Sequence, residues 1–153
     1  MIGLWMMLLS GFLLLGGPAR AADATFSDQE VASALPYDLG PATVDVSHYP
    51  PNQQANYALF QKKCSLCHTS ARALNFPLVD EAEWRRFIMR MHARAQANLI
   101  DEDDAMRIAS FLAYDGAERK LKDPESFARL QGLLDKRYAD LQKERQRRLA
   151  SCK

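Results

Sequence analysis

One pentapeptide constrains this chain more than any other feature. It is Cys64-Ser65-Leu66-Cys67-His68, which has the form C-x-x-C-H. On a helix, residues i, i+3 and i+4 lie on one face, so Cys64, Cys67 and His68 are expected to point at a common object. This spacing is typical of the attachment site of c-type haem. We therefore expect one covalent haem c, with thioether bonds to Cys64 and Cys67 and with His68 as an axial ligand of the iron.

Two other uses of paired cysteines fit the sequence less well. A thioredoxin-like dithiol belongs in a βαβ context, and no stretch of the sequence has the pattern of a strand. A structural zinc site needs four ligands, but the sequence has no second C-x-x-C and no H-x-x-x-H. The remaining cysteine, Cys152, is interpreted as an exposed thiol, with a lipid or intermolecular link as the alternative.

The N-terminus has the pattern of an export signal. Ile2 to Leu15 is almost entirely apolar, and Ala19-Arg20-Ala21 has the form of an A-x-A cleavage site. We therefore interpret residues 1–21 as a signal peptide, with a mature chain from Ala22. No lysine or arginine precedes the apolar run, which leaves an uncleaved N-terminal anchor as the alternative. Because c-type haem is attached outside the bacterial cytoplasm, both features predict a periplasmic protein.

The length and the hydrophobic periodicity predict an all-α protein with one compact domain. The chain has 153 residues, of which 48% are hydrophobic, and this is enough for one core. Residues 22–52 contain several prolines and are expected to form an extended arm. A helical domain around the haem is expected over residues 53–118, and an additional basic helix over residues 123–153. The net charge of +1 and the scattered basic residues argue against a nucleic-acid partner.

Acidic residues predict where three of the helices begin. Asp80 or Glu81 is expected to open one helix, and Asp101 is expected to cap the next. Asp123, followed by a proline, has the pattern of a further helix start. Gly116 is expected to end the helix that begins at Asp101, because glycine is common at helix C-termini.

Two apolar stripes indicate which helix faces are buried. The expected helix over residues 53–68 carries on one face Tyr57, Phe60, Cys64 and Cys67. The helix after Asp80 carries on one face Trp84, Phe87, Ile88 and Met91, and on its other faces Arg85, Arg86, Arg90 and Arg94. Residues 69–79 are expected to form a loop, and its apolar side chains, such as Leu74 and Phe76, are suited to line a haem edge.

These stretches together resemble a small bacterial monohaem class I-type cytochrome c domain over about residues 50–118. The resemblance rests on Tyr57, Phe60, Lys63-Cys64-Ser65, Cys67-His68-Thr69, Glu83-Trp84, Arg90-Met91, and an acidic cap before Ile108 and Phe111-Leu112. It implies a compact all-α fold around one haem c, His/Met ligation of the iron and one-electron transfer. The arm before residue 50 and the helix from Asp123 lie outside it.

The second axial ligand of the iron is the main open choice. Met89, Met91 and Met106 are the methionine candidates, and His48 and His92 are the nitrogen alternatives. Met91 lies on the apolar stripe, whereas Met89 lies about 200° from it around the helix. Met106 likewise lies about 200° from the apolar side of its own helix. We therefore expect Met91 as the ligand, with Met89 as the alternative.

These features predict an electron carrier and not an enzyme. The expected partners are a redox donor and a redox acceptor protein, and the arginine-rich faces are suited to steer an acidic partner. Membrane association is expected, if at all, through the N-terminus or the basic C-terminal helix. One alternative is a haem protein with an open sixth position, of the gas-binding or peroxidase type. Another is a haem subunit of a larger membrane oxidoreductase.

Overall fold

The computed structural model describes residues 26–94 and 100–151, and within them every regular element is a helix. The expected all-α class is therefore confirmed for this part of the chain. The elements in chain order are α1 (Asp28–Val31), η1 (Pro36–Leu39), α2 (Pro51–Cys64), α3 (Ala71–Asn75), α4 (Glu81–Arg94), α5 (Glu102–Gly116), η2 (Ala117–Leu121) and α6 (Pro124–Ser151). The expected signal peptide and Cys152 lie outside the described residues.

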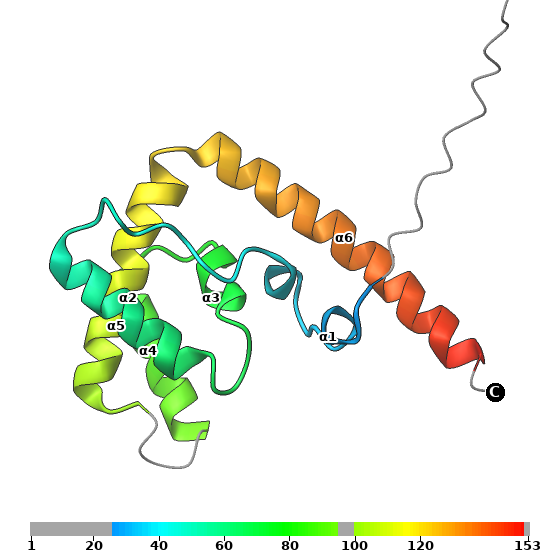
Figure 1. Cartoon of the computed structure of the whole chain (residues 1–153), viewed down its shortest axis with the longest axis horizontal. Helices are drawn as coiled ribbons and strands as arrows, with labels where there is room; N and C mark the ends of the chain where they lie inside the picture. Colours follow the sequence, from blue (N-terminus) through cyan, green and yellow to red (C-terminus); the bar gives the residue numbers. More distant parts are fainter. Residues whose placement is uncertain (1–25, 95–99, 152–153) are drawn as a thin grey trace, which may run out of the picture.

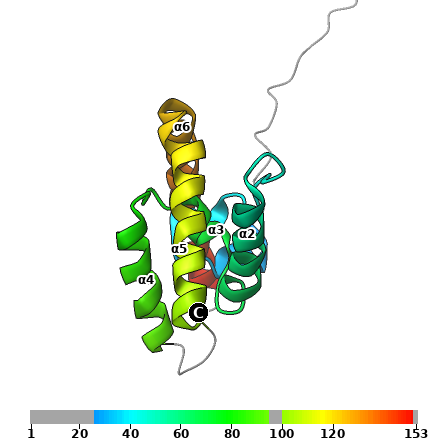
Figure 2. The same ribbon diagram turned by 90° about the vertical axis from the view of Figure 1, so that its left-hand side faces the viewer.

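The core lies between α2, α4 and α5. Figure 2 shows α5 between α4 on one side and α2 on the other, and α5 contacts both. Aromatic side chains join α2 to α5, because the ring centroids of Phe60 and Phe111 are 5.4 Å apart and those of Tyr57 and Phe111 are 5.1 Å apart. From α4, Trp84 and Ile88 are buried in the same cluster. The apolar stripes of α2 and α4 therefore both face α5.

The predicted helix starts are confirmed by their caps. Asp80 accepts a hydrogen bond from the Glu83 amide over 2.7 Å, and Asp101 accepts one from the Asp104 amide over 2.7 Å. Asp123 likewise accepts a hydrogen bond from the Ser126 amide over 3.0 Å. Each carboxylate satisfies an amide that has no partner within its helix, and the negative charge favours the helix N-terminus.

Gly116 is the last residue of α5, but the backbone stays helical beyond it, contrary to the expectation that this glycine ends the helix. Its φ angle is −61°, and the helix continues as the π-helical η2. The glycine serves close packing instead, since a Cβ atom at this position would lie 3.0 Å from Val79 Cγ1 and 3.3 Å from its Cα. A turn signal and a packing requirement look the same in a single sequence.

Two stretches expected to lack helices contain short ones. Residues 26–50, called here the arm, include α1 and η1, and the expected loop over residues 69–79 includes α3. The capping box of α1 is visible in the sequence as Ser27 followed by Glu30, and the two side chains bond each other's backbone amides. These helices have too few residues for an apolar period, so periodicity does not reveal them.

The C-terminal helix α6 lies outside the three-helix core and extends past it (Figure 1). It packs against α1, η1 and η2, and buries Leu134 and Leu141. It also holds the arm, because the Tyr138 hydroxyl donates to the Ala34 carbonyl over 2.8 Å and Arg145 Nε donates to the Val31 carbonyl over 2.8 Å. In residues 26–94 and 100–151, no helix combines the length and apolar character needed to cross a membrane.

Candidate cofactor site

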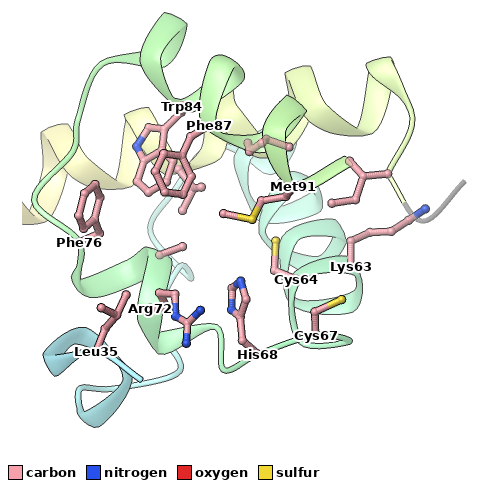
Figure 3. Close-up of a pocket in the computed structure, with 14 residues that line it drawn as sticks. Leu35, Lys63, Cys64, Cys67, His68, Arg72, Phe76, Trp84, Phe87 and Met91 are labelled. Atoms are coloured by element: carbon pink, nitrogen blue, oxygen red, sulfur yellow. The ribbon is translucent and has the colours of Figure 1, made fainter. Parts of the chain in front are cut away.

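A cavity of about 510 Å³ lies beside the C-terminal end of α2. Four residues that the sequence analysis singled out line it: Cys64, Cys67, His68 and Met91. Figure 3 shows His68 and Met91 facing the same space from opposite sides, with Cys64 between them at one edge. The structure therefore brings together residues from the end of α2, the turn after it and α4.

The C-x-x-C-H segment does not form one helix face as expected. The helix α2 ends at Cys64, so Cys67 and His68 lie in the turn that follows. The Ser65 hydroxyl donates to the Gln61 carbonyl over 2.6 Å, a side-chain bond that competes with continued helix formation. The turn still leaves all three side chains on the wall of the cavity, with Cys67 exposed at its rim.

His68 is oriented by a single backbone contact. Its Nδ1 lies 3.0 Å from the Thr69 carbonyl oxygen. A carbonyl oxygen only accepts, so Nδ1 is the donor, and in the neutral ring Nε2 carries the free lone pair. This is the tautomer that suits an imidazole ligand of a metal, because the bond at Nδ1 fixes both the ring and the free nitrogen.

The cysteines are not arranged as a reactive dithiol. Cys64 and Cys67 are free of any disulfide bond. Burial, together with the neighbouring Cys67, raises the pKa of Cys64 to about 12. Catalytic dithiols need the opposite, a thiol whose pKa is lowered by positive charge or a helix N-terminus. The surroundings of Cys64 therefore do not suit the chemistry of a catalytic dithiol.

The three methionine candidates differ in their exposure and in whether they line the cavity. Met91 lines the cavity, and its sulfur atom points into it (Figure 3). Met89 and Met106 are 43% and 40% exposed, respectively. Neither of them is among the residues that line the cavity. Helical phase, which separates Met91 from Met89 by about 200°, accounts for this difference.

The histidine candidates do not reach the cavity. His48 is exposed and packs its ring edge-on against Tyr49, with the centroids 4.6 Å apart. His92 donates a hydrogen bond from Nδ1 to the Ile100 carbonyl oxygen. Both side chains therefore have contacts elsewhere, and of the three histidines only His68 lines the cavity.

One wall of the cavity is aromatic. Phe76 lies edge-on to Trp84, with centroids 6.1 Å apart, and is 5.9 Å from Phe87. Trp84 is fixed by its Nε1–H, which donates to the Leu78 carbonyl over 3.2 Å. Phe76 was expected near a haem edge and does line the cavity, whereas Leu74 is buried in the core. Flat apolar side chains of this kind are suited to cover the face of a large ring.

Two cations, Arg72 and Lys63, line the cavity. In the sequence analysis, Lys63 was named only as part of the resemblance and Arg72 was not named. Arg72 is paired with Asp38 of the arm, with Nε–Oδ1 and Nη2–Oδ2 distances of 2.7 and 2.9 Å. Lys63 is 2.6 Å from Asp104. In the described part of the chain, the residues lining the cavity include no acid. The only sign in the sequence that Arg72 belongs to the site is its position four residues after His68.

These residues fit a haem better than a bare metal ion. Across residues 26–94 and 100–151, no three side chains from His, Cys, Asp and Glu gather as a metal-ion site. The cavity volume of about 510 Å³ is within the range of roughly 300–1,000 Å³ that small-molecule pockets have. Its apolar wall suits a macrocycle, its thiols suit covalent anchoring, and its cations suit the carboxylates that haem carries.

Comparison with known proteins adds nothing to this picture. No protein-family model matches the chain, and neither a curated protein nor a solved structure matches it. The residues that line the cavity are therefore the basis on which its function has to be judged.

Proposed function

We propose that this chain is a c-type cytochrome that carries single electrons between redox partner proteins. The observation that supports the proposal most strongly is that Cys64, Cys67, His68 and Met91, taken from three segments, line one cavity. A covalently bound haem c would supply an iron that gains and loses one electron. The chain itself would hold, orient and bury that group.

Each residue has a definite role in this proposal. Cys64 and Cys67 would hold the haem through thioether links, and His68 Nε2 would ligate its iron while Nδ1–H stays on the Thr69 carbonyl. Met91 would provide a second ligand to the iron, and a thioether ligand would raise the reduction potential. The aromatic wall keeps water out, so that the electron moves with little rearrangement of the surroundings. With both residues bound to the iron, no position would be left there for a substrate, and we propose an electron carrier and not an enzyme.

The proposed location is the periplasm, and the proposed partners are other redox proteins. This follows from the export signal in the sequence and from the compartment in which haem c is attached. Arg85, Arg86 and Arg90 of α4 are exposed. Such a basic helix face steers an acidic partner and affects the association rate more than the affinity.

The alternative of an open sixth position gains little support from the cavity. Peroxide chemistry needs polar groups on the distal side of the iron. His92, the histidine next to Met91, donates to the Ile100 carbonyl and does not line the cavity. Arg72 does line it, but lies beside His68 and not beside Met91 (Figure 3). A haem subunit of a larger oxidoreductase would be recognised by the size of the complex in solution.

The test is an absorption spectrum. The full chain is expressed with a c-type haem maturation system, and the reduced spectrum is recorded with and without carbon monoxide. We expect covalent haem and no change on adding carbon monoxide. Absence of covalent haem would overturn the proposal, and rapid carbon monoxide binding would replace the electron carrier with the open-site alternative.

A matched pair of variants tests the role of Met91. Met91→Ala is expected to open the sixth position, so that carbon monoxide now changes the reduced spectrum. Met89→Ala, two residues away on an exposed side chain, is expected to leave the spectrum unchanged. If both variants behave like the unmodified protein, Met91 is not the ligand.

A further inference from the structure

The ion pair between Asp38 and Arg72 joins the arm to the cavity. Arg72, on α3, lines the cavity, whereas Asp38, on η1, stands behind it and does not. The pair is bidentate, with distances of 2.7 and 2.9 Å. The side chain of Asp38 is 2% exposed and that of Arg72 is 28% exposed. A planar guanidinium held by both carboxylate oxygens has one well-defined orientation.

Asp38 is held in place from its other side as well. Its Oδ2 accepts hydrogen bonds from the Ala34 and Leu35 amides over 2.9 and 3.0 Å. Burial alone would raise the pKa of Asp38, but the hydrogen bonds from Arg72 and Leu35 and the charge of Arg72 outweigh it and hold that pKa below its ordinary value. Asp38 is therefore ionised at neutral pH.

The segment that carries Asp38 is fixed against α3. Asn75 Nδ2 donates to the Tyr37 carbonyl over 3.2 Å and to the Pro41 carbonyl over 3.1 Å. Gly40 packs so closely that a Cβ atom there would lie 2.4 Å from Asn75 Nδ2. These contacts fix the position of the Asp38 carboxylate. The ion pair with Asp38 therefore fixes the position of the Arg72 guanidinium.

The two charges of the pair lie at different distances from the cavity. Figure 3 shows the Arg72 guanidinium next to the His68 ring at the edge of the cavity. The positive member therefore lies nearer the cavity than the negative one. Asp38 is buried and Arg72 is partly buried, so water and salt screen this pair less than a pair of surface charges.

We propose that Asp38 positions Arg72 at the cavity, and that these two charges shift the reduction potential of the haem in opposite directions. This inference rests on the proposed haem site, and it makes the arm part of that site. Reduction lowers the charge on the iron by one unit. A neighbouring positive charge therefore stabilises the reduced form and raises the potential, and a negative charge lowers it.

Single substitutions separate the two charges. Asp38→Asn keeps an oxygen that can accept from the Ala34 and Leu35 amides, but it loses the charge and the fork that holds Arg72. We expect it to raise the potential, because the negative charge is lost while Arg72 stays on α3 and keeps its positive charge at the cavity wall. Arg72→Gln leaves the carboxylate of Asp38 without its partner, and we expect it to lower the potential. The double variant removes both charges and is expected to lie between the two single variants. Arg72→Lys keeps the positive charge but loses the bidentate pairing with Asp38. Its reduction potential should be nearer that of the unmodified protein than the potential of Arg72→Gln.

A control distinguishes charge from a loosened arm. Glu30, also in the arm, pairs with Arg137 of α6 and does not line the cavity. Glu30→Gln weakens the hold on the arm without changing a charge at the cavity, and we expect it to leave the potential unchanged. If the substitutions acted only by admitting water, Asp38→Asn, Arg72→Gln and Glu30→Gln would all lower the potential, because water stabilises the more highly charged oxidised iron.

The experiment is a redox titration of each purified full-length variant, after its covalent haem has been recorded. Amide exchange at Ala34 and Leu35 is measured alongside, and Asp38→Asn is expected to keep these amides protected. Shifts of opposite sign support the inference. Shifts of the same sign in haem-loaded protein overturn this inference alone. Failure to attach haem in the unmodified chain overturns both this inference and the proposed function.

Discussion

Lys120 donates a hydrogen bond to the Phe76 carbonyl oxygen over 2.7 Å, although only 4% of this lysine is exposed. It also donates to the Leu78 carbonyl over 3.2 Å. Its ammonium group lies near two aromatic rings, 5.9 Å from the Trp84 centroid and 5.6 Å from the Phe127 centroid. One side chain of η2 thus ties down the segment between α3 and α4 that carries Phe76 into the cavity wall.

This lysine predicts a specific pH dependence of stability. Burial lowers the pKa of Lys120 to about 8, against a reference value of about 10.4 in the unfolded chain. Between these values the unfolded chain binds a proton that the folded chain lacks, so this group makes stability rise as pH rises. Lys120→Met should destabilise the fold by about 1–3 kcal/mol, because the Phe76 carbonyl loses its donor.

The measurement is urea denaturation of both proteins between pH 7 and pH 10. The stability difference should grow with pH, because only the unmodified protein gains from the titration of Lys120. Lys122→Met is the matched control, since Lys122 is exposed and bonds Glu118. A difference that stays constant over this range would show that Lys120 does not titrate as proposed.

Gly40 and Gly132 predict opposite responses to the same substitution. Gly40→Ala would place a Cβ atom 2.4 Å from Asn75 Nδ2, and Asn75 is held there by the Tyr37, Pro41 and Ala71 carbonyls. Overpacking of this kind costs about 1–3 kcal/mol. Gly132 lies on exposed α6 with nothing within 4 Å of such a Cβ atom, and alanine there should stabilise the helix by about 0.5–1 kcal/mol. Denaturation curves of the two variants should move in opposite directions, and a stable Gly40→Ala would mean that Asn75 can shift.

The core and the cap positions were predictable from the sequence, because both depend on short-range patterns. Trp84, Ile88 and Phe60 face the core as their helical spacing indicates. The acidic caps at Asp80 and Asp101 depend only on residues three positions away. Amphipathic period and capping are local rules, and nothing from the rest of the chain changes their outcome here.

The site was predictable only in part, because some of its residues come from long-range contacts. Met91 could be preferred over Met89 by helical phase alone. The pairing of Asp38 with Arg72, by contrast, joins residues 34 positions apart. It depends on how the arm folds back onto α3, and the arm has no periodicity that would indicate this. The end of α2 at Cys64 was also missed, since C-x-x-C-H reads equally well as a continuing helix.

Among the acidic residues of the core, Asp115 is expected to cost the most stability when it is substituted. It is fully buried, accepts from the Tyr49 hydroxyl over 3.1 Å, and pairs with Arg119 through Nε over 2.7 Å. Asp115→Asn keeps the shape but leaves Arg119 without its counter-charge. Breaking a fully buried pair costs about 3–5 kcal/mol, and this is the upper limit here because the Arg119 side chain is 27% exposed. Tyr49→Phe removes one hydrogen bond and should cost about 0.5–1.5 kcal/mol.

Thermal or urea denaturation of the full chain measures both variants. Asp140→Asn is the matched control, because Asp140 is exposed and pairs with Lys143 over 3.0 Å. It should have no measurable effect on stability. Equal losses from Asp115→Asn and Asp140→Asn would contradict the buried network.

Several contacts hold the arm, and two of them, those of Arg145 and of the Asp38–Arg72 pair, can be tested separately. Arg145 of α6 donates from Nε to the Val31 carbonyl over 2.8 Å and from Nη2 to the Ser33 carbonyl. Arg145→Met removes both bonds, so α1 should open more often and the amides of residues 31–33 should exchange faster. The amides of Ala34 and Leu35 are bonded to Asp38, which Arg72 holds independently. Their exchange should therefore stay slow.

Hydrogen exchange followed by mass spectrometry resolves the two parts of the arm. Arg147→Met is the matched control, because Arg147 lies two residues further along α6, is exposed and pairs with Glu144. It should leave exchange in the arm unchanged. If Arg145→Met releases residues 31–35 together, α6 and not Arg72 determines the position of η1, and the cavity wall depends on the C-terminal helix. If only residues 31–33 are released, the arm stays at the cavity without Arg145, held by the contacts of Asp38 with Arg72 and of Asn75 with the Tyr37 and Pro41 carbonyls.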